Sequence, residues 1–452
     1  MPSALLYLGI MLVVIIAWFV LLKRPVYEAV LISFIVLLTV TGTWGNVLVY
    51  IDDALSTNLL YSMTAFVAMS ILLTKTKIVD SCVAIILSLL GRVTGGAGYV
   101  SVVASSFMGA LSGSGPGNAM ATGSMTVPAM IKSGFPRELA ANVVSNASYM
   151  GNMIPPSSNI VAAMGAFVAL YPEANLTTGQ FWIVLWGISL WFIAQRLLMV
   201  YLFCKHYKVK PMAKEDLPNL KQVLKEGWQG LLLPLIILLP FALDYAFKDN
   251  FFTDRLGAAG AKQLSSSLLL FIAGISSIYA CLISKDKKVV TPSSIANMFA
   301  KGVKTIAPAI GVCVFGYMIG SMFADLEVAA EMEAFIISMN FSKLGMVLFI
   351  CVITCFLGMV IPGSSLVVIF GSMFITTLSS TGVDPMLAAA MLPCICGVMC
   401  GITPPLGLGM YAGITLAEAD FGKTFKNNLW WVATQFIMQV VVLMGWLPIL
   451  GL

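Results

Sequence analysis

The chain has 452 residues, of which 59% are hydrophobic and only 10% are charged, and its mean hydropathy is +0.96. Soluble globular domains are far more polar, so this composition excludes that class and predicts an all-α polytopic membrane protein. The net charge of +5 is expected to come from cytoplasmic loops, as is usual for membrane proteins. We therefore expect contact with a lipid bilayer and no nucleic-acid partner.

The first apolar stretch, residues 5–22, has no basic residue before it and ends at Lys23 and Arg24. This pattern is the reverse of a cleaved signal and predicts a retained helix with its N-terminus outside. The piece between Lys77 and Arg92 is basic at both ends and too short to span, so it should lie along the inner surface. The other expected elements of this half are spans at about 26–45 and 57–73, a re-entrant hairpin at 94–131, a broken helix at 138–170 and a span at 180–203.

A basic linker at 205–227 is predicted to be cytoplasmic and to separate a first repeat, 1–204, from a second repeat, 228–452. The second repeat then starts from the opposite side of the membrane. Its expected elements are spans at about 228–246, 265–283 and 306–323, an acidic surface segment at 325–335, a hairpin at 343–383, a broken helix at 386–418 and a last span at 429–450. This layout places 21 of the 25 basic residues inside and both termini outside.

Matching spacings support the division into two inverted structural repeats. "GSMTVPAMIKSGFP" starts at residue 123 and "GSMFITTLSSTGVDP" at residue 371, and in each segment two glycines stand 11 residues apart. A Pro–Pro pair follows the second glycine after 21 residues in one half and 22 in the other, at 155–156 and 404–405. Secondary transporters are often built from such repeats, with the binding site at broken helices.

Irregular backbone at membrane depth is tolerated only where protein or a water-lined cavity satisfies its polar groups. Two hairpin tips and two Pro–Pro breaks can form that cavity, since breaks free carbonyl oxygens and tips present helix N-termini. Small residues could instead serve only close helix packing, but two patches with matching Pro–Pro pairs favour a transport site. The oxygen-bearing side chains beside the tips and breaks are Ser112, Ser114, Asn118, Asn152, Ser364, Ser365 and Thr403.

The predicted site contains no ionisable group. Residues 94–131, 139–170, 344–383 and 386–417 include no Asp, Glu, His, Lys or Arg. Sodium coupling therefore fits better than proton coupling, and an anionic substrate would be balanced by helix dipoles and bound cations. A nucleophile–base pair is missing too, so we expect no enzyme activity. "CICGVMC" at 394–400 could suggest a metal or redox cluster, but it lacks a nearby histidine and fits helix packing better.

Six motifs in order resemble the large, M-type permease subunit of tripartite ATP-independent periplasmic (TRAP) transporters, in the ion-transporter superfamily. The motifs are "GRVTGGAGYVSVVASSFMGALSGSG" (91–115), "TGSMTVPAMIKSGF" (122–135), "MIPPS" (153–157), "CFLGM" (355–359), "TGVDP" (381–385) and "GITPPLG" (401–407). Many members have an aspartate three residues after "LGM", where this chain has Pro362. The "GMVIPGSS" segment is closer to the fused TRAP branch, which leaves the receptor class open.

The resemblance implies an elevator-type carrier with horizontal arm helices, in the cytoplasmic (inner) membrane of a bacterium or archaeon. It implies sodium-driven import of organic acids delivered by a soluble extracytoplasmic receptor, usually together with a four-helix small membrane subunit, which we expect to be a separate polypeptide or absent. Two sodium sites follow by position, one at Ser112, Gly113, Ser114 and Asn152, the other at Gly358, Ser364, Gly401 and Thr403. Substrate contacts are expected at Ser114, Gly115, Asn118, Ser157, Ser365 and Pro405.

One alternative stays open within transport. A self-sufficient, ion-coupled organic anion carrier of the same superfamily would need no receptor. Neighbouring genes for a secreted binding protein and a four-helix membrane protein would distinguish the two.

Overall fold

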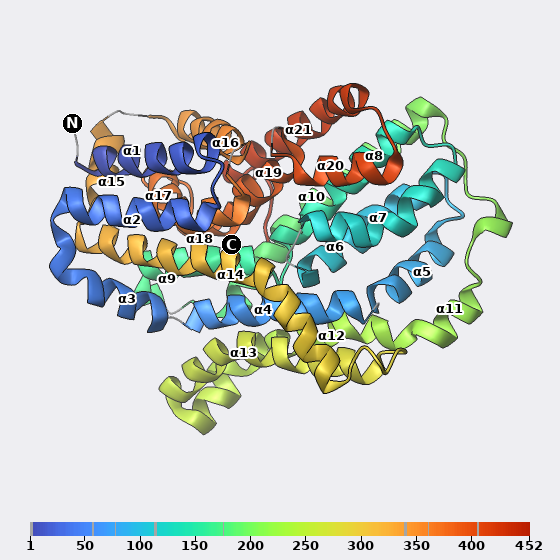
Figure 1. Cartoon of the computed structure of the whole chain (residues 1–452), viewed down its shortest axis with the longest axis horizontal. Helices are drawn as coiled ribbons and strands as arrows, with labels where there is room; N and C mark the ends of the chain where they lie inside the picture. The colour runs from blue at the N-terminus through green and yellow to red at the C-terminus, as the bar shows by residue number, and fades with distance from the viewer. Residues whose placement is uncertain are drawn as a thin grey trace.

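The computed structural model describes residues 3–56, 58–76, 78–112, 115–174, 176–338, 341–359, 361–404 and 406–452. Throughout these ranges the regular structure is helical and contains no strand, so the predicted all-α class is confirmed. Figure 1 shows the helices packed side by side, with the N-terminus at the edge of the molecule.

The helices of the first half follow the apolar segments and stop at local signals. The longest, α10, begins with a capping box between Thr177 and Gln180 and ends at Lys208 in the left-handed conformation. The set is α1 (Ser3–Ile16), α2 (Val26–Thr41), α3 (Val47–Ser56), α4 (Asn58–Lys75), α5 (Ile78–Leu90), α6 (Gly96–Ser112), α7 (Gly115–Lys132), α8 (Arg137–Ser148), α9 (Ser158–Leu170) and α10 (Thr178–Tyr207).

The second half begins at the linker and has the same kinds of start signals. Thr291 caps α14, Asp384 caps α18 and Asp420 caps α21 through their side-chain oxygens. The set is α11 (Leu220–Gly227), α12 (Leu232–Phe247), α13 (Thr253–Ile283), α14 (Pro292–Asp325), α15 (Val328–Ser338), α16 (Lys343–Gly358), α17 (Gly363–Ser379), α18 (Pro385–Leu392), α19 (Met399–Ile402), α20 (Leu408–Ala417) and α21 (Phe421–Leu443).

Several helix boundaries differ from the predicted spans, because hydropathy alone does not identify polar residues at the ends of a helix. The stretch after α2 forms a separate short helix, α3, and α14 starts at Pro292 instead of near 306. The last helix runs from Phe421 to Leu443 instead of 429–450, since Asp420 caps a polar first turn and Gly445 adopts a positive φ beyond its end. The inverted orientation of the halves and the horizontal placement of α5 and α15 stay predictions.

The two halves are interleaved rather than separate. Helix α20 of the second half packs on α8 and α7 of the first, while α9 of the first half packs on α18 and α17 of the second. Figure 1 shows α6, α7, α8 and α20 together on one side, and α9, α16, α17 and α18 on the other. Each interrupted helix therefore contributes one arm to each group.

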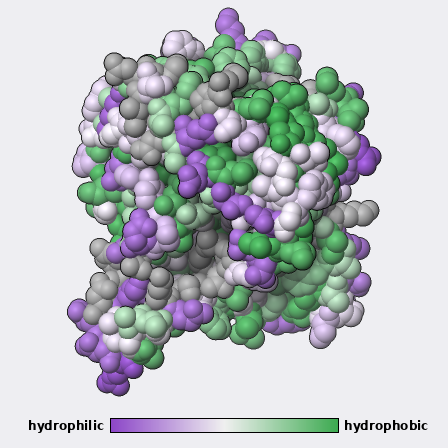
Figure 2. All heavy atoms as spheres, turned by 90° about the vertical axis from the view of Figure 1, so that its left-hand side faces the viewer, coloured by the Kyte–Doolittle hydropathy of each residue, from purple (hydrophilic) through white to green (hydrophobic). Residues whose placement is uncertain are grey.

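The outer surface carries many large apolar side chains, as expected of a surface that faces lipid. On α12 they recur every fourth residue, and the set is Leu235, Leu239, Leu243 and Phe247. Figure 2 shows hydrophobic areas over much of one face and hydrophilic residues at the tip of the lower projection, where α12 meets α13. Within the described residues, three helices are long and apolar enough to cross a membrane, or up to five if two bent pairs count as single spans.

Candidate functional site

Two helices are interrupted at the Pro–Pro pairs. The first break follows α8 through a 3₁₀ turn, η3 (Tyr149–Met153), and the second follows α18 through a π-helical turn, η8 (Pro393–Val398), and α19. Because Pro156 and Pro405 have no N–H, the carbonyls of Asn152 and Gly401 lose the partner that a continuous helix would supply. Each break therefore offers an oxygen of the kind that a hard cation requires.

The last helix of each half holds the carbonyl that lies two residues before the first proline. Ser189 of α10 donates from Oγ to the Met153 carbonyl at 3.0 Å, and Asn428 of α21 donates from Nδ2 to the Ile402 carbonyl at 2.6 Å. In each break one freed carbonyl is thus satisfied by a side chain, and the bond also fixes the backbone near the freed carbonyl of Asn152 or Gly401.

Each hairpin tip lies directly against the break of its own half. A Cβ on Gly109 would come within 2.7 Å of the Gly151 Cα, and one on Gly358 within 3.1–3.3 Å of the backbone and Cβ of Cys400. At the second tip the Gly363 N–H also donates to the Cys400 Sγ at 3.1 Å. This close approach explains the glycines at the tips, because any side chain would push tip and break apart.

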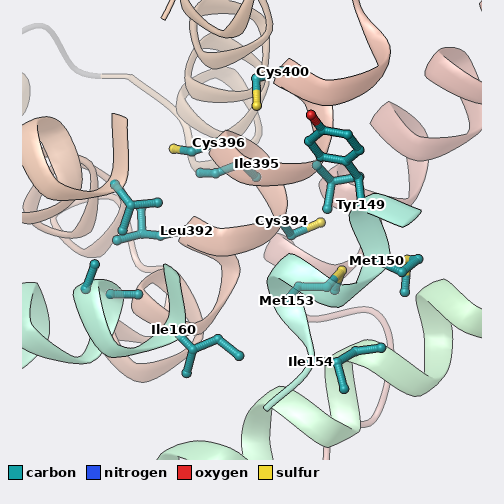
Figure 3. Close-up of a cluster of buried hydrophobic side chains, with 14 of the residues drawn as sticks. Tyr149, Met150, Met153, Ile154, Ile160, Leu392, Cys394, Ile395, Cys396 and Cys400 are labelled. Carbon is teal, nitrogen blue, oxygen red and sulfur yellow. The ribbon is translucent and has the colours of Figure 1, made fainter. Parts of the chain in front are cut away.

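The two breaks also contact each other in the buried centre of the molecule, and Figure 3 shows side chains from both. Asn152 donates from Nδ2 to the Gly397 carbonyl at 3.3 Å, which links η3 to η8. Tyr149, which is 4% exposed, points from the first break toward the second. Its ring carbons would lie 2.0–2.8 Å from a Cβ at Gly115, Gly401 or Gly409, so the ring occupies a slot made by three glycines.

The structure brings most of the predicted sodium ligands to these two places. Asn152 and Thr403 are buried, and the Thr403 Oγ1 donates to the Met399 carbonyl at 2.7 Å while its lone pairs stay available. Gly358 and Gly401 are buried at the second tip and break, and the Ser364 side chain is exposed there. Ser112 ends α6, while Gly113 and Ser114 lie outside the described residues, so their roles as ligands stay predictions.

The predicted substrate residues are less uniform. Gly115 opens α7 against the Tyr149 ring, and Ser157 is buried as the cap of α9, accepting from the Asn159 N–H at 3.3 Å. Ser365 is also buried, in the first turn of α17, and Pro405 lies outside the described residues. No observation assigns these residues to a substrate, and they stay predictions.

Asn118 of α7 has an oxygen free for a ligand. Its Nδ2 donates to the Ser105 carbonyl at 2.8 Å and to the Ser148 carbonyl at 2.9 Å, so the amide is firmly oriented. Its Oδ1 is buried and has no hydrogen-bond partner among the described residues. A buried acceptor in this state is costly, and a cation or a donor group of a ligand would satisfy it.

Arg196 of α10 is a buried charge that the sequence interpretation overlooked. It was counted among the cytoplasmic basic residues, but its side chain is only 1% exposed. It donates from Nε to the Asn146 carbonyl at 3.3 Å and from Nη1 to the Gln195 Oε1 at 2.6 Å, while Nη2 is unpartnered. No carboxylate pairs with it within the described ranges. An arginine inside the 181–203 apolar stretch was the signal that could have revealed it.

The cysteines of the second break pack in the core. Cys394, Cys396 and Cys400 are buried, and Gln435 of α21 donates from Nε2 to the Cys394 Sγ at 3.1 Å. No group of three or more His, Cys, Asp or Glu side chains in the described part of the chain could hold a metal ion.

The whole chain matches known transport proteins. The family model described as "Tripartite ATP-independent periplasmic transporter, DctM component" matches residues 5–450. The C4-dicarboxylate TRAP transporter large permease protein DctM of Vibrio cholerae is 27% identical over 386 residues, which cover 80% of each chain. The sialic acid TRAP transporter large permease protein SiaM of the same organism is 24% identical over 360 residues, covering 78% of this chain and 77% of the relative.

The fold also occurs in a solved transporter structure. The Alcanivorax borkumensis YdaH transporter superimposes with a TM-score of 0.61 at 16% sequence identity, over 90% of this chain and 88% of that chain. At this identity the likeness concerns the arrangement of the helices alone.

Proposed function

Because this chain belongs to the DctM component family of tripartite ATP-independent periplasmic transporters, a family of multi-pass membrane permeases, we propose that it imports organic acid anions by sodium symport. The observations that support sodium are the freed carbonyls at the two breaks and, separately, the orphaned Asn118 Oδ1 of α7, in segments whose sequence contains no acidic residue. Oxygen ligands suit a hard cation, and no carboxyl group is present there to carry a proton.

The substrate class rests on the relatives. One relative is named for C4-dicarboxylates and another for sialic acid, and both are carboxylic acids. A carboxylate can be balanced by the N-termini of α7 and α17 at the tips together with the bound sodium ions. The capture of dilute substrate would fall to a soluble extracytoplasmic receptor, with a separate four-helix membrane subunit beside this chain in the inner membrane.

The movement would be of the elevator type, with tips and breaks moving as one body. The hydrogen bonds of Ser189 and Asn428 support this proposal, since they tie α10 and α21 to the broken helices. The paired contacts of tip and break would then travel together with the substrate.

The test is uptake into proteoliposomes that contain this chain and its co-encoded small subunit, with purified receptor and radiolabelled C4-dicarboxylates and sialic acid offered in turn. Uptake should need the receptor and rise with sodium more steeply than first order. Equal uptake in potassium or choline with a proton gradient alone would contradict the sodium mechanism. Robust uptake without a receptor would favour a self-sufficient carrier.

Removing single hydroxyl groups tests where the sodium ions bind. Ser114→Ala and Ser364→Ala should each raise the sodium concentration for half-maximal uptake about tenfold, equivalent to roughly 1.4 kcal/mol of lost cation binding. Ser267→Ala is the matched control, because the hydroxyl of this half-buried serine on α13 donates to the Gln263 carbonyl one turn earlier in the same helix. The control should leave the sodium dependence unchanged.

A further inference from the structure

Tyr149 is a residue of the first break whose ring reaches beyond its own half. The nearest neighbours of the ring include Gly115, where α7 begins at the first tip, and Gly401 and Gly409 on either side of the second break. Figure 3 shows the side chain lying beside Cys400 of the second half. One aromatic ring therefore contacts the first tip and the second break at once.

The Tyr149 ring carbons make these contacts, and they lie so close to the glycine backbone that no Cβ atom would fit between them. A Cβ at Gly401 would stand 2.0 Å from the Tyr149 Cε1, and a Cβ at Gly115 would stand 2.4 Å from its Cζ. Glycine is required at both positions, because any side chain would overlap the ring. In a densely packed interior such a contact transmits small displacements instead of absorbing them.

A second link between the breaks is independent of the ring. Asn152, one turn after Tyr149, donates to the Gly397 carbonyl in η8. Asn152 belongs to the first proposed sodium site, and Gly397 precedes the second site at Gly401. The two proposed sites are thus joined by an aromatic contact and by a hydrogen bond.

We propose that Tyr149 is a positioning residue that couples the two sodium sites, so that an ion bound at one break favours binding at the other. This inference rests on the proposed function. An ion held by the Asn152 carbonyl fixes the end of η3, and with it the Tyr149 ring. The ring then fixes Gly401, whose carbonyl is the symmetry-matched ligand of the second site. Coupling between sites in proteins typically changes affinity by about 5- to 150-fold, and a factor near ten is expected here.

The experiment is equilibrium binding of radioactive sodium to the purified full-length chain in lipid nanodiscs, in a potassium background and without organic substrate. Wild type should bind two ions with a Hill coefficient clearly above one. Tyr149→Phe keeps the ring carbons that contact the glycines and loses only the hydroxyl, which contacts the Gly409 backbone, so it should keep most of this cooperativity. Tyr149→Leu should still bind two ions, but with a Hill coefficient of one and a weaker overall affinity.

Two further variants keep the test decisive. Tyr149→Met removes the ring while filling much of its volume, so it serves if the leucine variant folds poorly, and it should also lose cooperativity. Phe34→Leu removes a buried ring on α2 that packs against Tyr50, away from both breaks, and it should bind sodium as wild type does.

The outcomes separate the two proposals. Absence of sodium binding to wild type above the potassium background would overturn the sodium mechanism itself. Binding of two ions without cooperativity, or cooperativity that survives in both Tyr149→Leu and Tyr149→Met, would overturn the coupling role of Tyr149 and leave the sodium mechanism standing.

Discussion

The first and second breaks each have one carbonyl held by the last helix of their half, but they differ in local helix type and in side-chain chemistry. The first contains Tyr149 and Asn152 and is lined by the amides of α8, whereas the second contains buried cysteines and Gly401. In both, a donor from the last helix of the half holds the carbonyl two residues before the first proline. The feature common to both breaks is therefore the position of backbone carbonyls. We infer that the backbone forms each proposed ion site and that the side chains of each break modify it.

The tips differ in what they touch. Gly363 of the second tip approaches backbone, with its added Cβ 2.4 Å from the Gly397 Cα, whereas Gly115 of the first tip approaches the Tyr149 ring. Backbone in a packed helix moves only with its whole helix, whereas the Tyr149 ring can be displaced at the expense of its contact with Gly401. Position 363 should therefore tolerate a methyl group less well than position 115.

The largest effect is expected from Gly363→Ala. The added methyl group would force α17 away from η8, and overpacking of this kind costs about 1–3 kcal/mol, with this site at the upper end. Gly115→Ala should cost less, and Gly320→Ala, where nothing lies within 4 Å, should be neutral or slightly stabilising. Thermal unfolding of the three variants in one detergent measures the order. Equal losses at Gly363 and Gly320 would contradict the close approach of tip and break.

An intermediate effect is expected at the two donors that hold the break carbonyls. Asn428→Ala leaves the Ile402 carbonyl without its side-chain donor and removes one of the two acceptors of the Asn146 Nδ2, and should cost about 2 kcal/mol. Ser189→Ala orphans only the Met153 carbonyl and should cost about 1 kcal/mol. Unfolding of both variants and of the double mutant tests this ranking. The reverse order would mean that the second break does not depend on α21.

The smallest effect on stability is expected from Arg196→Met. The variant loses the bonds to Asn146 and Gln195 but also removes a buried charge that no described carboxylate compensates. Replacing buried charges by apolar groups is often neutral or stabilising, so the free energy of unfolding should change by less than about 1 kcal/mol. Arg196→Glu is the informative contrast, since it buries a new unpaired charge and should unfold the protein at much lower temperature.

Helix ends at the Pro–Pro pairs could be predicted because proline acts through local rules, whereas the re-entrant placement of the two hairpins stays a prediction. Pro–Pro ends a helix wherever it occurs, and the segments at 94–131 and 343–383 each contain a pair of helices in the structure. Tyr149 and Arg196 were missed for physical reasons. The proposed role of Tyr149 depends on three glycines that are distant from it in the sequence. No local sequence pattern reveals that these glycines form a slot for its ring.

Arg196 was missed for a different reason. The mean hydropathy of an apolar stretch changes little when one residue is charged, so the average does not reveal Arg196. Burying that charge is costly, and this cost is what marks the residue for attention. The last span was misplaced in a similar way, because its polar first turn at Phe421–Asn428 lowers the local hydropathy while Asp420 still starts the helix.

The membrane potential acts on the charge of Arg196, which no described carboxylate neutralises. Its Nε is bonded to the Asn146 carbonyl of α8, so any movement that carries the first break across the bilayer carries this charge along. Moving one elementary charge through the full field is worth about 2.3 kcal/mol per 100 mV. An inside-negative cell would therefore draw the unloaded carrier inward and slow its return, and the voltage across the membrane would set how fast the transporter resets.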